Sequence, residues 1–331
     1  MNNEKPKSYE IDAVFTWVDG NDIAHKRKMK PYLKDDRSWS NEKFRTRFDQ
    51  VDEIELAVKS IVKFAPFIRR IFIVTDGQTP SFLSDYNETK KNNFPAIKII
   101  DHKVIFSKHE SYLPIFNCLP IETMLYEIPN LSEHFIYFND DFFLINKTKP
   151  SDFFIHGQPV IRGKWTSFDE NIFYKVIHHR IVKFLGKTTK EKKYRYKRGQ
   201  QTAAKILKFE KYFKIDHTPA PMRISTLKNY FDQHPSMQLR NIRHKFRNPE
   251  QYVLQSLANH IEIKNESCDL KFDYQLLYFG SYRKPLIWYK FLLNKNKNNP
   301  NKLFLNMQSL DLCAEHKLKY IIKWLYKTFI V

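Results

Sequence analysis

Four short stretches rich in β-branched and aromatic residues constrain the fold more than any other feature of this chain. They lie at residues 11–18, 70–75, 96–100 and 134–138. Residues 52–64 and 117–127 lie between them and have helical patterns. Strands that alternate with helices predict an α/β fold, in which a mostly parallel sheet with right-handed crossovers is flanked by helices.

Each of these stretches is followed by an aspartate: Asp19, Asp76, Asp101 and Asp140. A single aspartate after a strand is common in turns and helix caps. The carboxyl ends of parallel strands share one edge of a sheet, however, and ligands bind beyond that edge in open α/β sheets. Four carboxylates at one edge are suited to a divalent cation that is shared with a polyanionic substrate.

The charge balance points to a phosphate-rich partner or to a compositional bias of the source genome. The chain has 56 Lys and Arg against 36 Asp and Glu, a formal net charge of +20, and basic residues cluster over 175–214. Nucleic acid, an anionic lipid surface and a diphosphate substrate each suit such a charge. Nucleic acid is disfavoured, because the aspartates after the strands would repel its phosphates unless a metal ion intervened.

Glycine and cysteine usage excludes several kinds of site. The 7 glycines form no dinucleotide-binding or P-loop motif, so side chains and a metal ion would have to hold any phosphate. The 3 cysteines form no C-x-x-C pair and indicate no disulfide framework. Residues 1–10 are polar and no run of 18 apolar residues occurs, which predicts a cytoplasmic protein.

The last stretch of the chain, residues 313–331, has the pattern of a basic amphipathic helix. Its apolar positions fall on one face and are Leu318, Ile321, Ile322, Leu325, Tyr326 and Phe329. Such helices are typical of peripheral binding to a membrane surface. A final helix packed on the protein core is the alternative.

Several sequence blocks resemble the Stealth family of hexose-1-phosphate transferases. The blocks are IDAVFTWVDGND at 11–22, DEIELAVKSIVKFAPFIRRIFIVTDGQTPSFL at 52–83, LSEHFIYFNDDFFL at 131–144, HTPAPMR at 217–223 and FRNPEQY at 246–252. The family includes bacterial capsular polysaccharide phosphotransferases and the animal lysosomal-enzyme N-acetylglucosamine-1-phosphotransferase. For the family's last block the nearest candidate is FLNM at 304–307, where Met307 replaces an expected acidic residue and Asp311 is an alternative carboxylate.

The resemblance implies a reaction and an architecture. A hexose-1-phosphate, such as N-acetylhexosamine-1-phosphate, would pass from a UDP-sugar to a hydroxyl of an oligosaccharide or polysaccharide acceptor in capsular or surface polysaccharide synthesis. The resemblance also implies a peripheral location at the inner face of the cytoplasmic membrane, where capsules are assembled. The reaction would form a phosphodiester, release UMP and use Mg²⁺ or Mn²⁺. The sheet would be of the GT-A or Rossmann-like type. Residues 1–150 would form an α/β half that binds the nucleotide-sugar, and residues 151–331 a more helical, basic half that completes one integrated catalytic domain.

An ordinary GT-A type glycosyltransferase is the alternative, because a sheet with acidic strand ends would serve both reactions. That enzyme would release UDP in place of UMP.

The resemblance also implies which residues form the site. The expected catalytic residues are Asp140, Asp141, His217 and Arg247. The expected substrate contacts are Asp19, Asp22, Arg45, Arg47, Asp76, Gln78, Asn139 and Asn306, and Asp19 and Asp140 would hold the metal ion. Asp141 or His217 would take the proton of the acceptor hydroxyl. His217 is a candidate because a neutral imidazole can accept a proton at pH 7. Arg247 would hold the reacting phosphate, because its planar charge cannot be lost.

Overall fold

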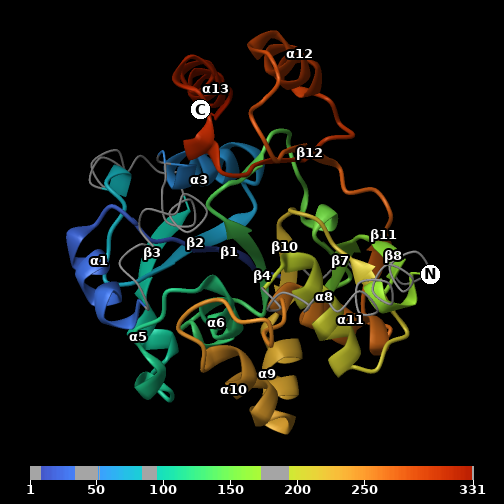
Figure 1. Cartoon of the computed structure of the whole chain (residues 1–331). Coiled ribbons are helices and arrows are strands. Elements are labelled where there is room, and N and C mark those ends of the chain that lie inside the picture. The colour runs from blue at the N-terminus through green and yellow to red at the C-terminus, as the bar shows by residue number, and fades with distance from the viewer. Residues whose placement is uncertain (1–8, 34–50, 52, 84–94, 173–193, 330–331) are drawn as a thin grey trace, which may run out of the picture.

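A five-stranded sheet forms the centre of the molecule in the computed structural model, which describes residues 9–33, 51, 53–83, 95–172 and 194–329 (Figure 1). The strand order is β10-β4-β1-β2-β3. The strands are β1 (Ile11–Thr16), β2 (Ile68–Thr75), β3 (Ala96–Asp101), β4 (His134–Asn139) and β10 (Ala220–Arg223). Neighbours pair in parallel except β10, which is antiparallel to β4. The predicted α/β fold with a mostly parallel sheet is confirmed.

Two hydrophobic layers cover the two faces of this sheet. Alternate residues of β1 point to opposite faces, as the two-residue period of a strand requires: Ala13 and Phe15 belong to one buried cluster, and Val14 belongs to the other. Helices α3 (Glu53–Phe64) and α13 (Glu315–Phe329) cover the first face. Helices α6 (Cys118–Thr123), α9 (Ile224–Gln233), α10 (Pro235–Ile242) and α11 (Leu254–Lys264) cover the second, on the opposite side in Figure 1.

Smaller elements surround this frame. The other α-helices of the described residues are α1 (Ile23–Met29), α5 (His102–Ile105), α8 (Tyr196–Ile206) and α12 (Leu286–Asn296). Three small sheets have the orders β11-β7-β6, β12-β13-β5 and β8-β9. Their strands are β5 (Phe142–Leu144), β6 (Phe154–Ile155), β7 (Gln158–Arg162), β8 (Lys164–Ser167), β9 (Lys211–Lys214), β11 (Asp269–Lys271), β12 (Leu276–Phe279) and β13 (Phe304–Met307). Among the described residues, no helix is long and apolar enough to cross a membrane.

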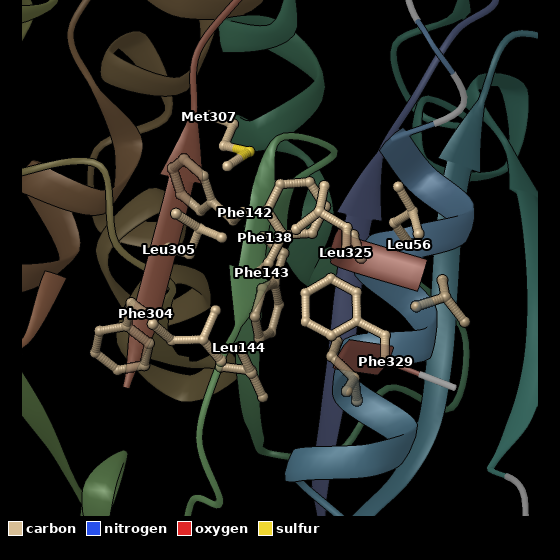
Figure 2. Packing of buried hydrophobic residues seen from close by; sticks show 14 of the residues in the cluster. Leu56, Phe138, Phe142, Phe143, Leu144, Phe304, Leu305, Met307, Leu325 and Phe329 are labelled. Carbon is tan, nitrogen blue, oxygen red and sulfur yellow. The ribbon is translucent and has the colours of Figure 1, made fainter. Parts of the chain in front are cut away.

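The last helix packs on the core. Figure 2 shows Leu325 and Phe329 of α13 among the buried side chains of α3, β4 and β5. The Phe329 ring stacks on Phe143 with the ring centroids 5.8 Å apart, and the Tyr326 hydroxyl donates to Glu55 Oε2 at 2.8 Å. The apolar face that suggested a membrane helix is therefore covered by the protein, in agreement with the alternative that we considered.

The predicted division at residue 150 stays a prediction. Three elements of the second half pack on the first half: β10 extends the central sheet beside β4, β13 pairs with β5, and α13 packs on α3.

Candidate active site

A cavity of about 450 Å³ opens beyond the carboxyl ends of β1 and β4. Five of the predicted site residues line it: Asn139, Asp140, Asp141, His217 and Arg247. They come from three separate segments of the chain, namely the β4–β5 turn, the loop before β10 and the loop before α11. The fold thus brings the FNDD, HTP and FR motifs to one place. The alternative carboxylate Asp311 also lines the cavity.

The two acidic residues of the β4–β5 turn form an electrostatically unfavourable pair. Burial in the cavity wall raises the pKa of both Asp140 and Asp141, and the Asp140 charge raises the pKa of Asp141 further. Asp141 Oδ1 has no hydrogen-bond partner in the described part of the chain. A cation close to this pair would offset the repulsion between the two carboxylates and would give Asp141 Oδ1 a partner.

Strand β13 supports Asp141 from behind. Asn306 Nδ2 and the Met307 backbone N–H both donate to the Asp141 carbonyl oxygen at 3.2 Å. Asn306 is fully buried and is not part of the cavity lining, although we expected it to contact the substrate. Its place in the structure is that of a residue that positions the acidic pair.

His217 is held in a stack of three rings. It lies between Tyr196, with a centroid distance of 5.0 Å, and Tyr278, at 5.5 Å and an interplanar angle of 5°. Burial lowers the pKa of His217 below its usual value, with a partly opposing effect of Asp216. The imidazole is therefore neutral at pH 7 and able to accept a proton. Among the described residues, no hydrogen bond occupies its ring nitrogens.

Arg247 lines the cavity next to the first residue of α6. Its Nη2 is 3.6 Å from Cys118 Sγ, and its guanidinium carbon is 5.7 Å from the centroid of the Tyr194 ring. The described residues offer it no salt bridge to a carboxylate within 4.0 Å. The guanidinium is thus free to bind a phosphate group with two parallel hydrogen bonds.

Two carboxylates in the cavity wall were not predicted from the sequence. Glu53, in the first turn of α3, is 6% exposed, and its pKa is raised to about 8 by burial and then by the Asp140 charge. Glu122, in α6, is 5% exposed and accepts hydrogen bonds from the Tyr137 hydroxyl at 3.2 Å and from Gln255 Nε2 at 3.1 Å. Burial raises the pKa of Glu122 as well.

Their sequence context offered one signal. Glu53 begins an amphipathic helix, and the next residue, Ile54, lies on its buried face. This position next to the buried face was the sequence signal for a buried Glu53. Glu122 follows Leu119, Pro120 and Ile121 on a six-residue helix, and nothing in this pattern distinguishes a cavity residue from a surface acid.

Three predicted substrate contacts instead bond to one another near the end of β1. Gln78 Nε2 donates to Asp22 Oδ2 at 2.9 Å and to the Asp19 carbonyl oxygen at 3.0 Å, while the Asp19 backbone N–H donates to Gln78 Oε1 at 2.9 Å. Asp22 also caps α1 through the Ala24 N–H. None of the three residues lines the cavity.

Asp76 does not line the cavity itself but contacts residues near it. Its carboxylate contacts His25 Nδ1 at 3.1 Å and Lys28 Nζ at 2.7 Å. Burial opposes the ionisation of Asp76, but the hydrogen bonds of His25 and Lys28 outweigh burial and hold its pKa below the usual value. His25 and His102 line the cavity in its place, and burial lowers the pKa of His102 to about 4.

The other predicted residues divide into two groups. Asp101 caps the short helix α5 by accepting from the Lys103 N–H at 2.8 Å, which is the turn chemistry that we considered for each aspartate. Arg45 and Arg47 lie outside the described residues.

The acidic pair fits a divalent cation in part. Mg²⁺ binds through one or two carboxylates together with substrate phosphates, and Asp140 and Asp141 supply such a pair with one unsatisfied oxygen. Within the described residues, no three His, Cys, Asp or Glu side chains are grouped closely enough to enclose a metal ion. Asp19, expected as a ligand, is not part of the cavity lining.

Two family models match the N-terminal half of the chain, and several named proteins match somewhat under half of its length. Residues 9–37 match Stealth protein conserved region 1, and residues 47–160 match conserved region 2. A capsular polysaccharide phosphotransferase of Haemophilus influenzae is 45% identical over 145 residues, which cover 44% of this chain and 37% of that protein. One of Neisseria meningitidis is 40% identical over 149 residues, which cover 44% of this chain and 38% of that protein. The match thus spans well under half the length of these relatives.

Among solved structures, the galactosyltransferase LgtC in complex with donor and acceptor sugar analogues is similar over 97% of both chains, with 11% sequence identity and a TM-score of 0.46. Residues 9–37 and 47–160 are thus similar to conserved regions 1 and 2 of the Stealth family, and the resemblance expected from the motifs in these residues is confirmed.

Proposed function

We propose that this chain transfers a hexose-1-phosphate from a UDP-sugar to a saccharide hydroxyl, with release of UMP, in the synthesis of a capsular or surface polysaccharide in the cytoplasm. One observation carries the proposal: the acidic pair, His217 and Arg247 come from separate Stealth-like motifs and line one cavity. The named relatives are capsular polysaccharide phosphotransferases, which supports the same reaction class.

The cavity residues have the chemistry that this transfer needs. A bond forms between the acceptor oxygen and the β-phosphorus of the donor, and the bond from that phosphorus to the bridging oxygen breaks, so that this oxygen leaves with UMP. The acceptor proton passes to a base, for which neutral His217 and Asp141 are the two candidates in the cavity. Arg247 holds the phosphate oxygens whose charge grows in the transition state.

A divalent cation, Mg²⁺ or Mn²⁺, is part of the proposal. Asp140 would hold it, together with Asp141 if His217 is the base, and it would neutralise charge on the diphosphate. Asp19 is left out of this set, because its backbone and side chain are engaged in the turn after β1.

The nucleotide product distinguishes this reaction from that of an ordinary glycosyltransferase. The protein would be incubated with UDP-N-acetylhexosamines and UDP-hexoses, Mg²⁺ and saccharide acceptors, and the released nucleotide would be identified by chromatography. The expected product is UMP in an amount equal to the phosphodiester formed. UDP as the sole nucleotide product would overturn the proposal and favour the GT-A glycosyltransferase.

A further inference from the structure

Helix α12 presents an apolar face that the described protein does not cover. Ile287 and Phe291 are 74% and 60% exposed, and Trp288 beside them is 38% exposed. Ile287 and Phe291 are four residues apart, so both side chains lie on one face of the helix. Figure 1 shows α12 at the outer edge of the molecule, beside α13.

The opposite face anchors α12 to the core, so the exposed side chains are presented on a fixed helix. Tyr289 and Leu293 are fully buried. The Tyr289 hydroxyl donates to the Ser281 carbonyl oxygen at 3.0 Å, and Trp324 Nε1 of α13 donates to Asn294 Oδ1 at 2.9 Å.

The charged side chains of the segment that carries α12 are all positive. Residues 274–310 contain six Lys or Arg and no Asp or Glu. Arg283, Lys284 and Lys295 are exposed, and in the described part of the chain none of them forms a salt bridge. Lys295 Nζ lies 5.6 Å from the centroid of the Phe291 ring, so positive charge and apolar surface adjoin each other.

We infer that α12 is a docking helix for an anionic lipid bilayer, a contact that goes beyond the proposed transfer reaction. Apolar and aromatic side chains of a basic helix enter the boundary between headgroups and acyl chains, and neighbouring cations attract the anionic headgroups. A second copy of the chain is disfavoured as the occupant, because two α12 faces would bring their uncompensated cations together. No residue of α12 lines the cavity, so the docking helix is separate from the proposed site.

Sedimentation of the whole chain with lipid vesicles tests this inference. One set of vesicles is pure phosphatidylcholine, and the other contains about one third phosphatidylglycerol. The protein should bind the anionic vesicles, bind the neutral vesicles far less, and be released by high salt. The double variant I287S/F291S should weaken binding at least about tenfold, since it removes the apolar anchor.

A matched control separates the position of these residues from their exposure. The variant I23S/F272S also removes an exposed isoleucine and an exposed phenylalanine, 66% and 58% exposed, and it should bind as the parent protein does. Circular dichroism checks that both variants are folded. The inference is overturned if anionic vesicles do not bind, or if I287S/F291S binds them as well as the parent. A concentration-dependent dimer that I287S/F291S abolishes would also overturn it and would assign the helix to self-association.

Discussion

At the residue scale, His217 is the group in the cavity whose environment is best suited to accept a proton. The two flanking tyrosine rings fix its position, and burial keeps its pKa below 6.5, so protonation inactivates it only in acid. We expect the variant His217→Ala to lose about 10²-fold or more in turnover. We also expect the acid limb of the parent's pH–rate profile to lie below pH 6.5 and to be absent from the residual activity of the variant.

His244 provides the matched control for this variant. It is half-buried, burial lowers its pKa too, and it is not part of the cavity lining. His244→Ala should keep near-parental turnover. Near-parental turnover of His217→Ala, or an unchanged acid limb, would leave Asp141 as the base.

Arg247 should contribute to the transition state more than to substrate binding. Arg247 lines the cavity, whereas Arg243, four residues earlier, is bonded to Glu250 at the surface. Arg247→Ala should lower kcat by about 10²-fold or more. Arg247→Lys should recover only part of this loss, because an ammonium group cannot form the two parallel hydrogen bonds.

The same assay on Arg243→Ala should give near-parental kcat. If Arg247→Ala raised KM and left kcat unchanged, the guanidinium would bind the substrate and its transition state equally, contrary to the role proposed for it.

Individual residues also show what a single sequence can predict of a site. Asp140, Asp141, His217 and Arg247 could be placed in one site from the sequence because they stand in motifs, and they line one cavity in the structure. Gln78 also stands in a motif but does not line the cavity, and its amide group bonds to Asp19 and Asp22, so its contact with the substrate stays a prediction. Glu122 was unpredictable, because its place in the wall depends on a contact with Gln255, which is 133 residues away.

At the scale of elements, a buried carboxylate joins the first two strands of the sheet. Asp12 of β1 accepts from Arg69 Nε at 2.9 Å and Nη2 at 2.7 Å in β2, and from the Ser132 N–H at 2.8 Å before β4. The variant Asp12→Ala leaves the Ser132 N–H unsatisfied. We expect a loss of about 3 kcal/mol in the free energy of unfolding, at the lower end for a broken buried pair because Arg69 keeps contact with water.

Glu10 offers an internal comparison, since it contacts the same arginine at the surface. Glu10→Ala should change the free energy of unfolding by about 0.5 kcal/mol or less in denaturant titrations. Equal losses for the two variants would mean that the burial of Asp12 is not what gives this interaction its strength.

Strands and helices were predictable where the pattern is local. The four expected strands coincide with β1 to β4 within about two residues, since strands of a parallel sheet that is covered on both faces have continuous runs of β-branched and aromatic residues. Strands β10 and β13 could not be predicted from the sequence alone, because their partners β4 and β5 are far away in the chain. The covering of α13 by α3 depends on the same kind of long-range contact.

At the scale of the whole molecule, a chain with a net charge of +20 gathers carboxylates around one cavity. Glu53, Glu122, Asp140 and Asp141 all have raised pKa values, so the folded protein retains protons that the unfolded chain releases. The contribution of these four groups to stability therefore falls as pH rises through their raised pKa values. This concentration of acid also suits a site that binds its polyanionic substrate together with a cation.

Glu53 allows one part of this pH dependence to be isolated. Its pKa is about 8 in the folded protein and near 4.5 ordinarily, so its stabilising contribution is complete below pH 4.5 and is lost as pH rises through 8. In that window the loss is on the order of 1 kcal/mol per pH unit. The variant Glu53→Gln does not titrate, so its free energy of unfolding should fall less steeply between pH 5 and pH 8. Denaturant titrations across this range measure the two slopes, and parallel slopes would show that Glu53 is ionised throughout.

Mg²⁺ added at pH 8 should stabilise the parent protein, because the cation offsets the repulsion between the Glu53 and Asp140 carboxylates. The variant Asp140→Asn should lose most of that effect.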